Sequence, residues 1–160
     1  MRLLTLDPGG TTGYCFMETY NGREAINRFV SGQLGPQPHH INLWEGLLEL
    51  KPDIVVSESF EYRNKARAGL VLVSKEYIGI TKLWCNLYEK EYKEQSPASA
   101  MGFVQDQHIK NLSMWKTGNP HAMDAVRHMI YYCTNPNIDP SLSFVRDRFL
   151  RLGYRQEQPN

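Results

Sequence analysis

Three short apolar segments follow one another within the first 33 residues, and turn-forming residues separate them. Residues 2–6 form an apolar run that ends at the Pro-Gly-Gly sequence of residues 8–10. Residues 12–19 and 25–33 flank the Asn-Gly dipeptide at 21–22, which favours the tight turn of a β-hairpin. A chain that begins in this way is predicted to start with three antiparallel strands, whose faces later segments must cover.

The rest of the chain predicts helices with two further strands between them. Residues 54–57 form a short apolar run, typical of a strand that is covered on both faces. Residues 92–95 suggest a polar edge strand. Apolar spacing and helix-start signals predict helices at 41–50, 68–89, 105–115 and 121–133, and one that follows Ser96-Pro97. This order of elements predicts an α/β fold, with a sheet flanked by helices.

The length of 160 residues is enough for one full-sized core, and we expect a single domain over residues 1–160. The segment from about residue 136 onward is polar and basic, so we expect a flexible tail there. The net charge is +1, from 18 Lys and Arg against 17 Asp and Glu. Any binding to nucleic acid must therefore rest on local basic patches.

The cysteines and the N-terminus indicate where such a chain works. Cys15, Cys85 and Cys133 form no close pair and no zinc-binding spacing, so buried free thiols of a reducing compartment are expected. The first residues do not have the pattern of a signal peptide, and no stretch approaches the roughly 20 apolar residues that cross a membrane. We expect a cytoplasmic protein without a membrane partner.

Three acidic residues stand in positions that favour a shared site. Asp7 ends the first strand, Glu58 ends the 54–57 strand, and Asp124 lies in the last predicted helix, on the same face as His121. Carboxylates from three distant segments tolerate one another only if positive charge lies between them. A pair of divalent metal ions supplies that charge, and such ions also hydrolyse phosphate esters.

Each of these residues has an ordinary structural interpretation when it is taken alone. Asp7 can cap the turn that follows it, Glu58 can be a surface acid, and a His-x-x-Asp pair is usually a local contact within a helix. The three together, in this order along the chain, favour a functional site far more than any one of them.

The order and spacing of these motifs resemble those of the RuvC-type Holliday junction resolvases, over about residues 1–134. The matching segments are Asp7-Pro8-Gly9 with Thr12-Gly13, Val55-Val56-Ser57-Glu58, and His121-x-x-Asp124-Ala125. The small resolvases of bacteriophages are the most similar, which implies the host cytoplasm as the location. The resemblance implies the RNase H-like fold of the retroviral integrase superfamily, a five-stranded mixed sheet with helices on both faces.

The resemblance also implies an activity and a set of site residues. The family consists of homodimers that use Mg²⁺ or Mn²⁺, two ions per site, to nick branched DNA such as four-way junctions. Asp7, Glu58 and Asp124 match its metal-binding carboxylates. His121 falls where the family has a fourth acid or a histidine, so it is a candidate ligand and catalytic residue. Flaps and forks are further candidate substrates.

The segment after Glu58 carries the candidate DNA contacts. The family often has an aromatic wedge near this point, and aromatic side chains can stack on an unpaired base. Basic side chains beside a nuclease site would meet DNA phosphates, although such a charge run is also common on an ordinary solvated surface. The candidates are Phe60, Tyr62, Arg63, Lys65 and Arg67.

Three other functions share parts of this pattern. An RNase H or a flap nuclease would direct the same chemistry to another substrate. An actin-like ATPase or sugar kinase would share Asp7-x-Gly9-x-Thr11, but it needs two large domains and a second phosphate loop, which 160 residues do not supply. A branched-DNA-binding module without catalysis would not need the three acids.

The sequence also gives expected positions for two further sets of residues. The remaining histidines have no ligand-like partner in the sequence, and we expect them at the surface or at the edge of the core: His39, His40, His108 and His128. The apolar positions of the 68–89 helix, such as Leu70, Val73 and Tyr77, are candidates for a dimer interface.

Overall fold

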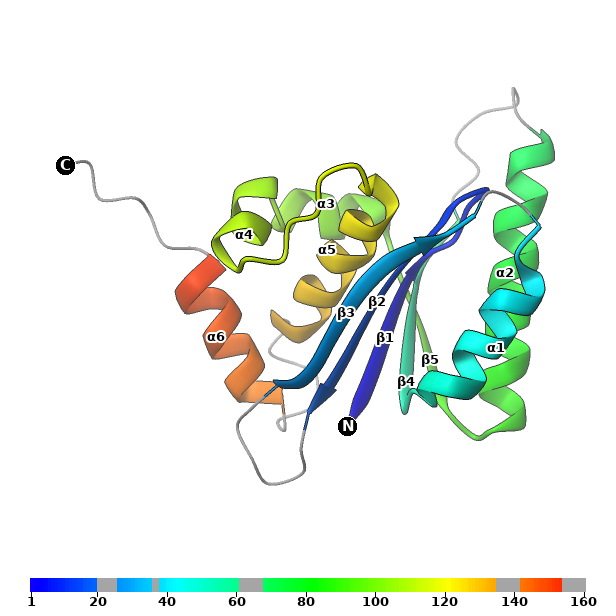
Figure 1. Cartoon of the computed structure of the whole chain (residues 1–160), viewed down its shortest axis with the longest axis horizontal. Helices are drawn as coiled ribbons and strands as arrows, with labels where there is room; N and C mark the ends of the chain where they lie inside the picture. Colours follow the sequence, from blue (N-terminus) through cyan, green and yellow to red (C-terminus); the bar gives the residue numbers. More distant parts are fainter. Residues whose placement is uncertain (20–25, 36–37, 61–67, 135–141, 154–160) are drawn as a thin grey trace.

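The computed structural model describes residues 1–19, 26–35, 38–60, 68–134 and 142–153. Five strands form one sheet in the order β3-β2-β1-β4-β5 (Figure 1). β1 pairs antiparallel with β2, and β2 with β3, whereas β4 runs parallel to both β1 and β5. The strands are β1 (Arg2–Asp7), β2 (Thr12–Thr19), β3 (Ile26–Leu34), β4 (Ile54–Glu58) and β5 (Glu91–Gln95). The predicted mixed sheet of five strands is confirmed.

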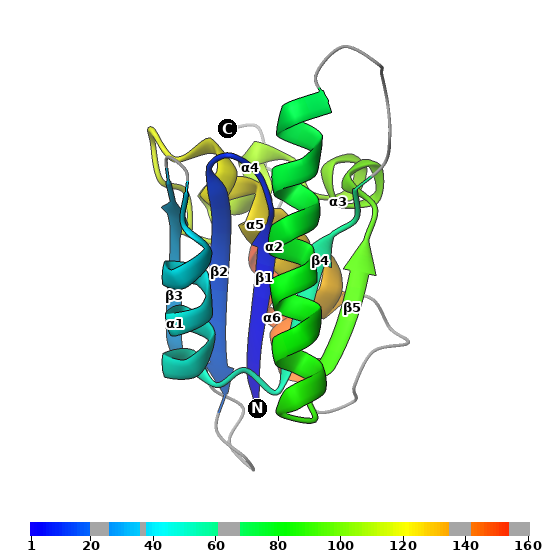
Figure 2. The same cartoon turned by 90° about the vertical axis from the view of Figure 1, so that its right-hand side faces the viewer.

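Helices cover both faces of this sheet (Figure 1). α1 (His40–Leu50) and α2 (Ala68–Leu87) lie side by side on one face, as Figure 2 shows from that side. The other face carries α3 (Pro97–Phe103), α4 (Asp106–Asn111), α5 (Pro120–Thr134) and α6 (Ser143–Gly153). Among the described residues, no helix is both long and apolar enough to cross a lipid bilayer.

The sheet separates two hydrophobic cores, because successive residues of a strand point to opposite faces. Leu3 of β1 packs into the core beneath α5 and α6, and the adjacent Leu4 packs into the core beneath α1 and α2. β4 is covered on both sides in the same way, since Val55 and Val56 are both fully buried but belong to different cores. This burial explains its short, continuous apolar sequence.

Two predictions about the second half of the chain are wrong. The tail expected from about residue 136 contains α6, whose Val145 and Phe149 are fully buried against the α5 core. The helix expected at 105–115 ends at Asn111, because Ser113 takes a left-handed backbone (φ 58°) that turns the chain.

The dimer-interface candidates on α2 need correction. Tyr77 is only 1% exposed and belongs to the core between α2, α1 and the sheet, and Val73 packs against that core. The Tyr77 side chain is therefore not free to bind another protomer. The side chain of Leu70 lies outside the described residues. Among the α2 side chains that the structure describes, the exposed large apolar ones are Leu83 and Leu87, near the C-terminal end of the helix.

Candidate metal centre

Asp7 and Glu58 lie side by side because their strands run parallel. β1 and β4 pair in a register that places Leu6 opposite Ser57, so the next residue of each strand is an acid at the same edge of the sheet. Side chains at the carboxyl ends of adjacent parallel strands project into a common space beyond the sheet. The sheet topology therefore brings together two carboxylates that are 51 positions apart in the sequence.

Gly13 lets α5 approach this edge of the sheet. Gly13 pairs with Asp7 across β1 and β2, and a Cβ atom at Gly13 would lie 1.9 Å from the backbone oxygen of His121. Only a residue without a side chain fits such a contact. The Thr5 hydroxyl donates a hydrogen bond to the carbonyl oxygen of Ala125, 2.7 Å away, and ties the next turn of α5 to β1.

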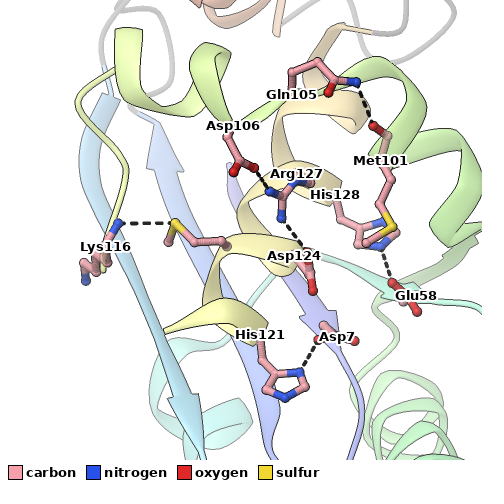
Figure 3. Close-up of polar contacts among 11 residues, drawn as sticks. Asp7, Glu58, Met101, Gln105, Asp106, Lys116, His121, Asp124, Arg127 and His128 are labelled. Atoms are coloured by element: carbon pink, nitrogen blue, oxygen red, sulfur yellow. Dashed lines mark hydrogen bonds and ion pairs between the residues drawn. The ribbon is translucent and has the colours of Figure 1, made fainter. Parts of the chain in front are cut away.

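The first turns of α5 thereby complete a cluster of three potential ligands. Nδ1 of His121 lies 2.8 Å from Oδ2 of Asp7 (Figure 3). One ligand atom each from Asp7, His121 and Asp124 lie within 4.8 Å of one another. The Asp7 side chain is 14% exposed, that of Asp124 24% and that of His121 43%, so the cluster opens to solvent on the His121 side.

Glu58 borders this cluster but belongs to a second set of contacts. Its Oε2 lies 2.9 Å from Nε2 of His128 (Figure 3). Nδ1 of His128 lies 2.9 Å from Oε1 of Gln95. The Glu58 carboxylate still acts on the cluster, because its charge raises the pKa of both Asp7 and Asp124. Three of the four predicted ligands thus meet directly, and the fourth adjoins them.

The electrostatics of the site disfavour negative charge on Asp7 in the absence of a cation. Burial and the neighbouring Glu58 carboxylate raise the pKa of Asp7 from 3.8 to about 6, and the hydrogen bond with His121 only partly opposes them. Burial also raises the pKa of Asp124, against the opposing charge of Arg127. A bound cation would reverse this balance by stabilising the ionised carboxylates.

This balance predicts that metal-free Asp7→Asn is more stable than the wild type at pH 7. The folded state keeps the Asp7 proton up to about pH 6, whereas the unfolded chain releases it near pH 4. Stability therefore falls as pH rises from about 4 to 6. The variant escapes this loss, which amounts to at most about 3 kcal/mol. Thermal unfolding in EDTA between pH 4 and pH 8 measures the difference.

Two comparisons sharpen that measurement. Asp147→Asn, whose side chain is 72% exposed, is expected to track the wild type at every pH. Millimolar Mg²⁺ or Mn²⁺ is expected to raise the melting temperature of the wild type more than that of Asp7→Asn, because an ion that binds only the folded state stabilises it. Equal curves for wild type and Asp7→Asn under all conditions would refute the clustered site.

Arg127 on α5 holds Asp124 in place. Its Nη1 donates to Oδ1 of Asp124 at 2.5 Å, and its Nη2 donates to Oδ1 of Asp106 on α4 (Figure 3). The Arg127 side chain is largely buried, so this contact is not a freely solvated surface pair. A hollow of about 290 Å³ lies beside it, lined by residues that include Trp115, Lys116, Asn119 and Asp124.

A buried histidine fixes the turn that follows Asp7. The Thr12 hydroxyl donates to the Gly9 carbonyl oxygen at 3.1 Å, and Nε2 of His39 lies 2.8 Å from the same hydroxyl oxygen. With the single hydrogen of that hydroxyl directed at Gly9, Nε2 of His39 is the donor in its contact. The His39 ring is 2% exposed and stacks on Tyr77, with the ring centroids 4.1 Å apart. Of the two positions expected for His39, the surface or the edge of the core, the structure excludes the surface.

Comparison with solved structures relates this arrangement to known proteins. RuvC of Thermus thermophilus superimposes with a TM-score of 0.58 and 13% identity, over 82% of this chain and 93% of that one. The same protein in complex with a Holliday junction substrate gives 0.58 and 16%, over 82% and 92%. The Holliday junction resolvase of fowlpox virus gives 0.58 and 14%, over 82% and 97%. No family model matches the sequence, and no curated protein matches it.

The chain has the RuvC-type, RNase H-like fold. The fold class predicted from the sequence motifs is thus confirmed. With this RuvC-type fold, Asp7 and Glu58 lie at the ends of the two central parallel strands, and His121 and Asp124 lie on the helix that crosses them.

The donor set fits a hard divalent cation. Two carboxylates and an imidazole surround one space, and a third carboxylate borders it. Carboxylate oxygens suit Mg²⁺ and Mn²⁺, and Mn²⁺ also accepts an imidazole ligand. The raised pKa of Asp7 agrees with this, because such crowding of acids is relieved by a cation.

Most of the predicted DNA contacts lie outside the described residues. Tyr62, Arg63, Lys65 and Arg67 belong to the 61–67 segment, so the structure places none of them. Phe60 is described and half-buried, and the ammonium nitrogen of Lys75 lies 5.1 Å from the centre of its ring. Phe60 therefore follows the candidate metal ligand Glu58 closely, while part of its ring faces α2.

Sequence reasoning missed the side chains that hold the ligands. His128, expected at the surface or the core edge, is 1% exposed and touches Glu58. A signal for it exists, because His128 follows Asp124 by four residues and His121 by seven, which places all three on one side of a helix. Arg127 follows Asp124 by three residues, which is also a contact spacing.

Proposed function

We propose that this protein is a divalent-metal-dependent endonuclease that nicks Holliday junctions or related branched DNA. The observation that supports this most is the cluster of Asp7, His121 and Asp124, with Glu58 beside it, at one edge of a RuvC-type sheet. The structural neighbours add support: T. thermophilus RuvC and the fowlpox virus resolvase have each been solved with Holliday junction DNA.

In this proposal four side chains share the binding of two Mg²⁺ or Mn²⁺ ions. Asp7 would be shared by both ions, Glu58 would hold one of them, Asp124 would hold the other or both, and His121 would add an imidazole ligand. When bound there, such ions would lower the pKa of a coordinated water and stabilise charge on the leaving oxygen of the phosphodiester. Arg127 keeps Asp124 oriented through Oδ1, and the turn held by Thr12 and His39 fixes the end of β1 that carries Asp7.

The proposal assigns DNA contact to side chains around this edge. Phe60 and Tyr62 are candidates to stack on bases near the branch point, and Arg63, Lys65 and Arg67 are candidates to bind phosphates. The hollow beside Asp124 and Arg127 offers a second place for the DNA backbone. Lys116 is among the residues that line it, and its amine donates to the carbonyl oxygen of Ser31 at 2.5 Å.

Cleavage of matched substrates tests the proposal. Purified protein is incubated with a labelled four-way junction, a flap, a linear duplex and an RNA–DNA hybrid, each with Mg²⁺, Mn²⁺ or EDTA. We expect metal-dependent paired nicks in the junction and little cleavage of the duplex. Preferential cutting of the hybrid or the flap would indicate an RNase H or a flap nuclease with the same metal-dependent chemistry. Binding of branched DNA without cleavage in either metal would indicate a DNA-binding module without catalytic activity.

The protein is expected to form a homodimer, because a four-way junction presents two equivalent phosphates for cleavage. Light scattering of the free protein and of its junction complex measures the mass directly. Two protomers per junction are expected, and each junction should receive two nicks. A monomer in both measurements would contradict this and favour a nuclease for flaps or hybrids.

His121→Asp is expected to retain much of the cleavage activity, and His121→Ala is expected to lose more of it. An aspartate can replace the ligand atom, whereas alanine removes it, so higher Mn²⁺ should restore part of the alanine variant's rate. Protonation of an imidazole ligand competes with metal, so His121→Asp should also flatten the acidic limb of the rate profile. Rates from about pH 5.5 to 9 at two Mn²⁺ concentrations test this, and unchanged profiles for both variants would exclude His121 as a ligand.

A further inference from the structure

His128 joins the ends of two strands from beneath the proposed site. It lies on α5 one turn after Asp124, and its side chain is 1% exposed. Its Nε2 lies 2.9 Å from Oε2 of Glu58, and its Nδ1 lies 2.9 Å from Oε1 of Gln95. Glu58 and Gln95 are paired residues at the ends of β4 and β5. The ring therefore spans both strand ends.

The direction of these hydrogen bonds follows from the chemistry of the groups. An ionised carboxylate only accepts, so Nε2 of His128 carries a hydrogen and donates to Glu58. The other ring nitrogen either donates to the amide oxygen of Gln95 or accepts from its NH₂ group, whose two ends exchange by rotation of the amide. In both arrangements Gln95 holds one side of the ring and Glu58 receives a hydrogen bond from the other.

Among the residues that the structure describes, His128 is the side chain that hydrogen-bonds the Glu58 carboxylate and holds it inward. Glu58 is the last residue of β4, and its side chain is 25% exposed. Its negative charge is repelled by that of Asp7. A flexible carboxylate in this position would gain by swinging toward solvent, away from the like charge. The buried donor on α5 counters that movement before any cation is present.

We propose that His128 and Gln95 are positioning residues for Glu58, an inference that rests on the proposed metal-dependent function. His128 occupies Oε2 and leaves Oε1 as the oxygen available to an ion beside Asp7, while Gln95 holds the His128 ring. Groups that hydrogen-bond to a metal ligand typically change metal affinity 10- to 100-fold when they are removed. The same effect is expected here, although neither residue touches the ion or the DNA.

Matched variants of His128 test this inference. His128→Leu fills a similar volume without a donor, and His128→Gln keeps an amide NH₂ group near the position of Nε2. The readouts are the Mn²⁺ concentration that gives half of the maximal rise in melting temperature and the concentration that gives half of the maximal cleavage rate. We expect both to rise at least about tenfold in His128→Leu and to stay within about threefold in His128→Gln.

Gln95→Leu is the second variant. It tests the inference by itself if the His128→Leu protein does not fold. It removes the support of the ring from a half-buried position at the end of β5, so the same change in a smaller amount is expected. The inference would be overturned if either folded leucine variant depended on Mn²⁺ in the same way as the wild type. It would also be overturned if Mn²⁺ did not change the melting temperature of the wild-type protein. If the wild type binds Mn²⁺ but cuts no substrate, the proposed function fails, and the melting comparison alone decides on His128.

Discussion

Asp7→Asn is expected to lower the rate of junction cleavage at least about a thousandfold, while junction binding stays nearly unchanged. Asp7 is the least exposed of the three clustered ligands, and in the proposed mechanism it is shared by both ions. Loss of a ligand common to two ions removes several kcal/mol of transition-state stabilisation, which corresponds to this change in rate. Basic contacts to phosphate do not depend on that carboxylate.

Single-turnover cleavage and a gel-shift titration, both in Mn²⁺, measure the two quantities separately. Asp147→Asn makes the same chemical change at an exposed site on α6 and should cut at the wild-type rate. Because Asp7→Asn is expected to be at least as stable as the wild type without metal, a loss of rate cannot be attributed to unfolding. Cleavage within tenfold of the wild type by a pure preparation would exclude this site.

Gly13→Ala is expected to lower the free energy of unfolding by about 3 kcal/mol and to weaken metal binding in the fraction that folds. The added Cβ would lie 1.9 Å from the oxygen and 2.2 Å from the carbon of the His121 backbone carbonyl. Because this neighbour is backbone, the overlap is relieved only by moving α5 away from β2. That movement would pull His121 and Asp124 away from Asp7.

Gly79→Ala provides the control, since an added Cβ there meets no atom within 4 Å and the residue lies inside α2. Its stability is expected to be unchanged or up to about 1 kcal/mol higher, because alanine favours the helix. Urea unfolding of both variants and their melting shift in Mn²⁺ measure these effects. A Gly13→Ala protein with wild-type stability and wild-type metal response would show that α5 does not depend on this contact.

The strands could be predicted because their signals are local. The Asn-Gly turn and the Pro-Gly-Gly turn delimit the first three, and the short apolar run of 54–57 needs only burial on both faces to become β4. The packing of α6 was harder to foresee. Its arginines suggested a solvated tail, although Leu142, Val145 and Phe149 recur at helical spacing and are all buried.

The proposed ligands could be chosen from the sequence because each ends a strand or begins a helix, where side chains can converge. Their supporting residues could not, because each depends on a partner from a distant segment. His39 contacts Thr12 of β2 and Tyr77 of α2, and His128 reaches the ends of β4 and β5. The spacing of His128 from Asp124 places both on one side of α5, but only the tertiary structure shows which partners a histidine has.

The contact between His121 and Asp7 joins residues 114 positions apart. Closing so long a segment of chain carries a large entropic penalty, and contacts of this kind tend to form late in folding. A chain still emerging from the ribosome, or one cut before α5, has β1 but no partner for Asp7. The proposed nuclease would therefore be inert until α5 has been made, and an ion bound across this contact would fasten the first strand to a helix that is synthesised much later.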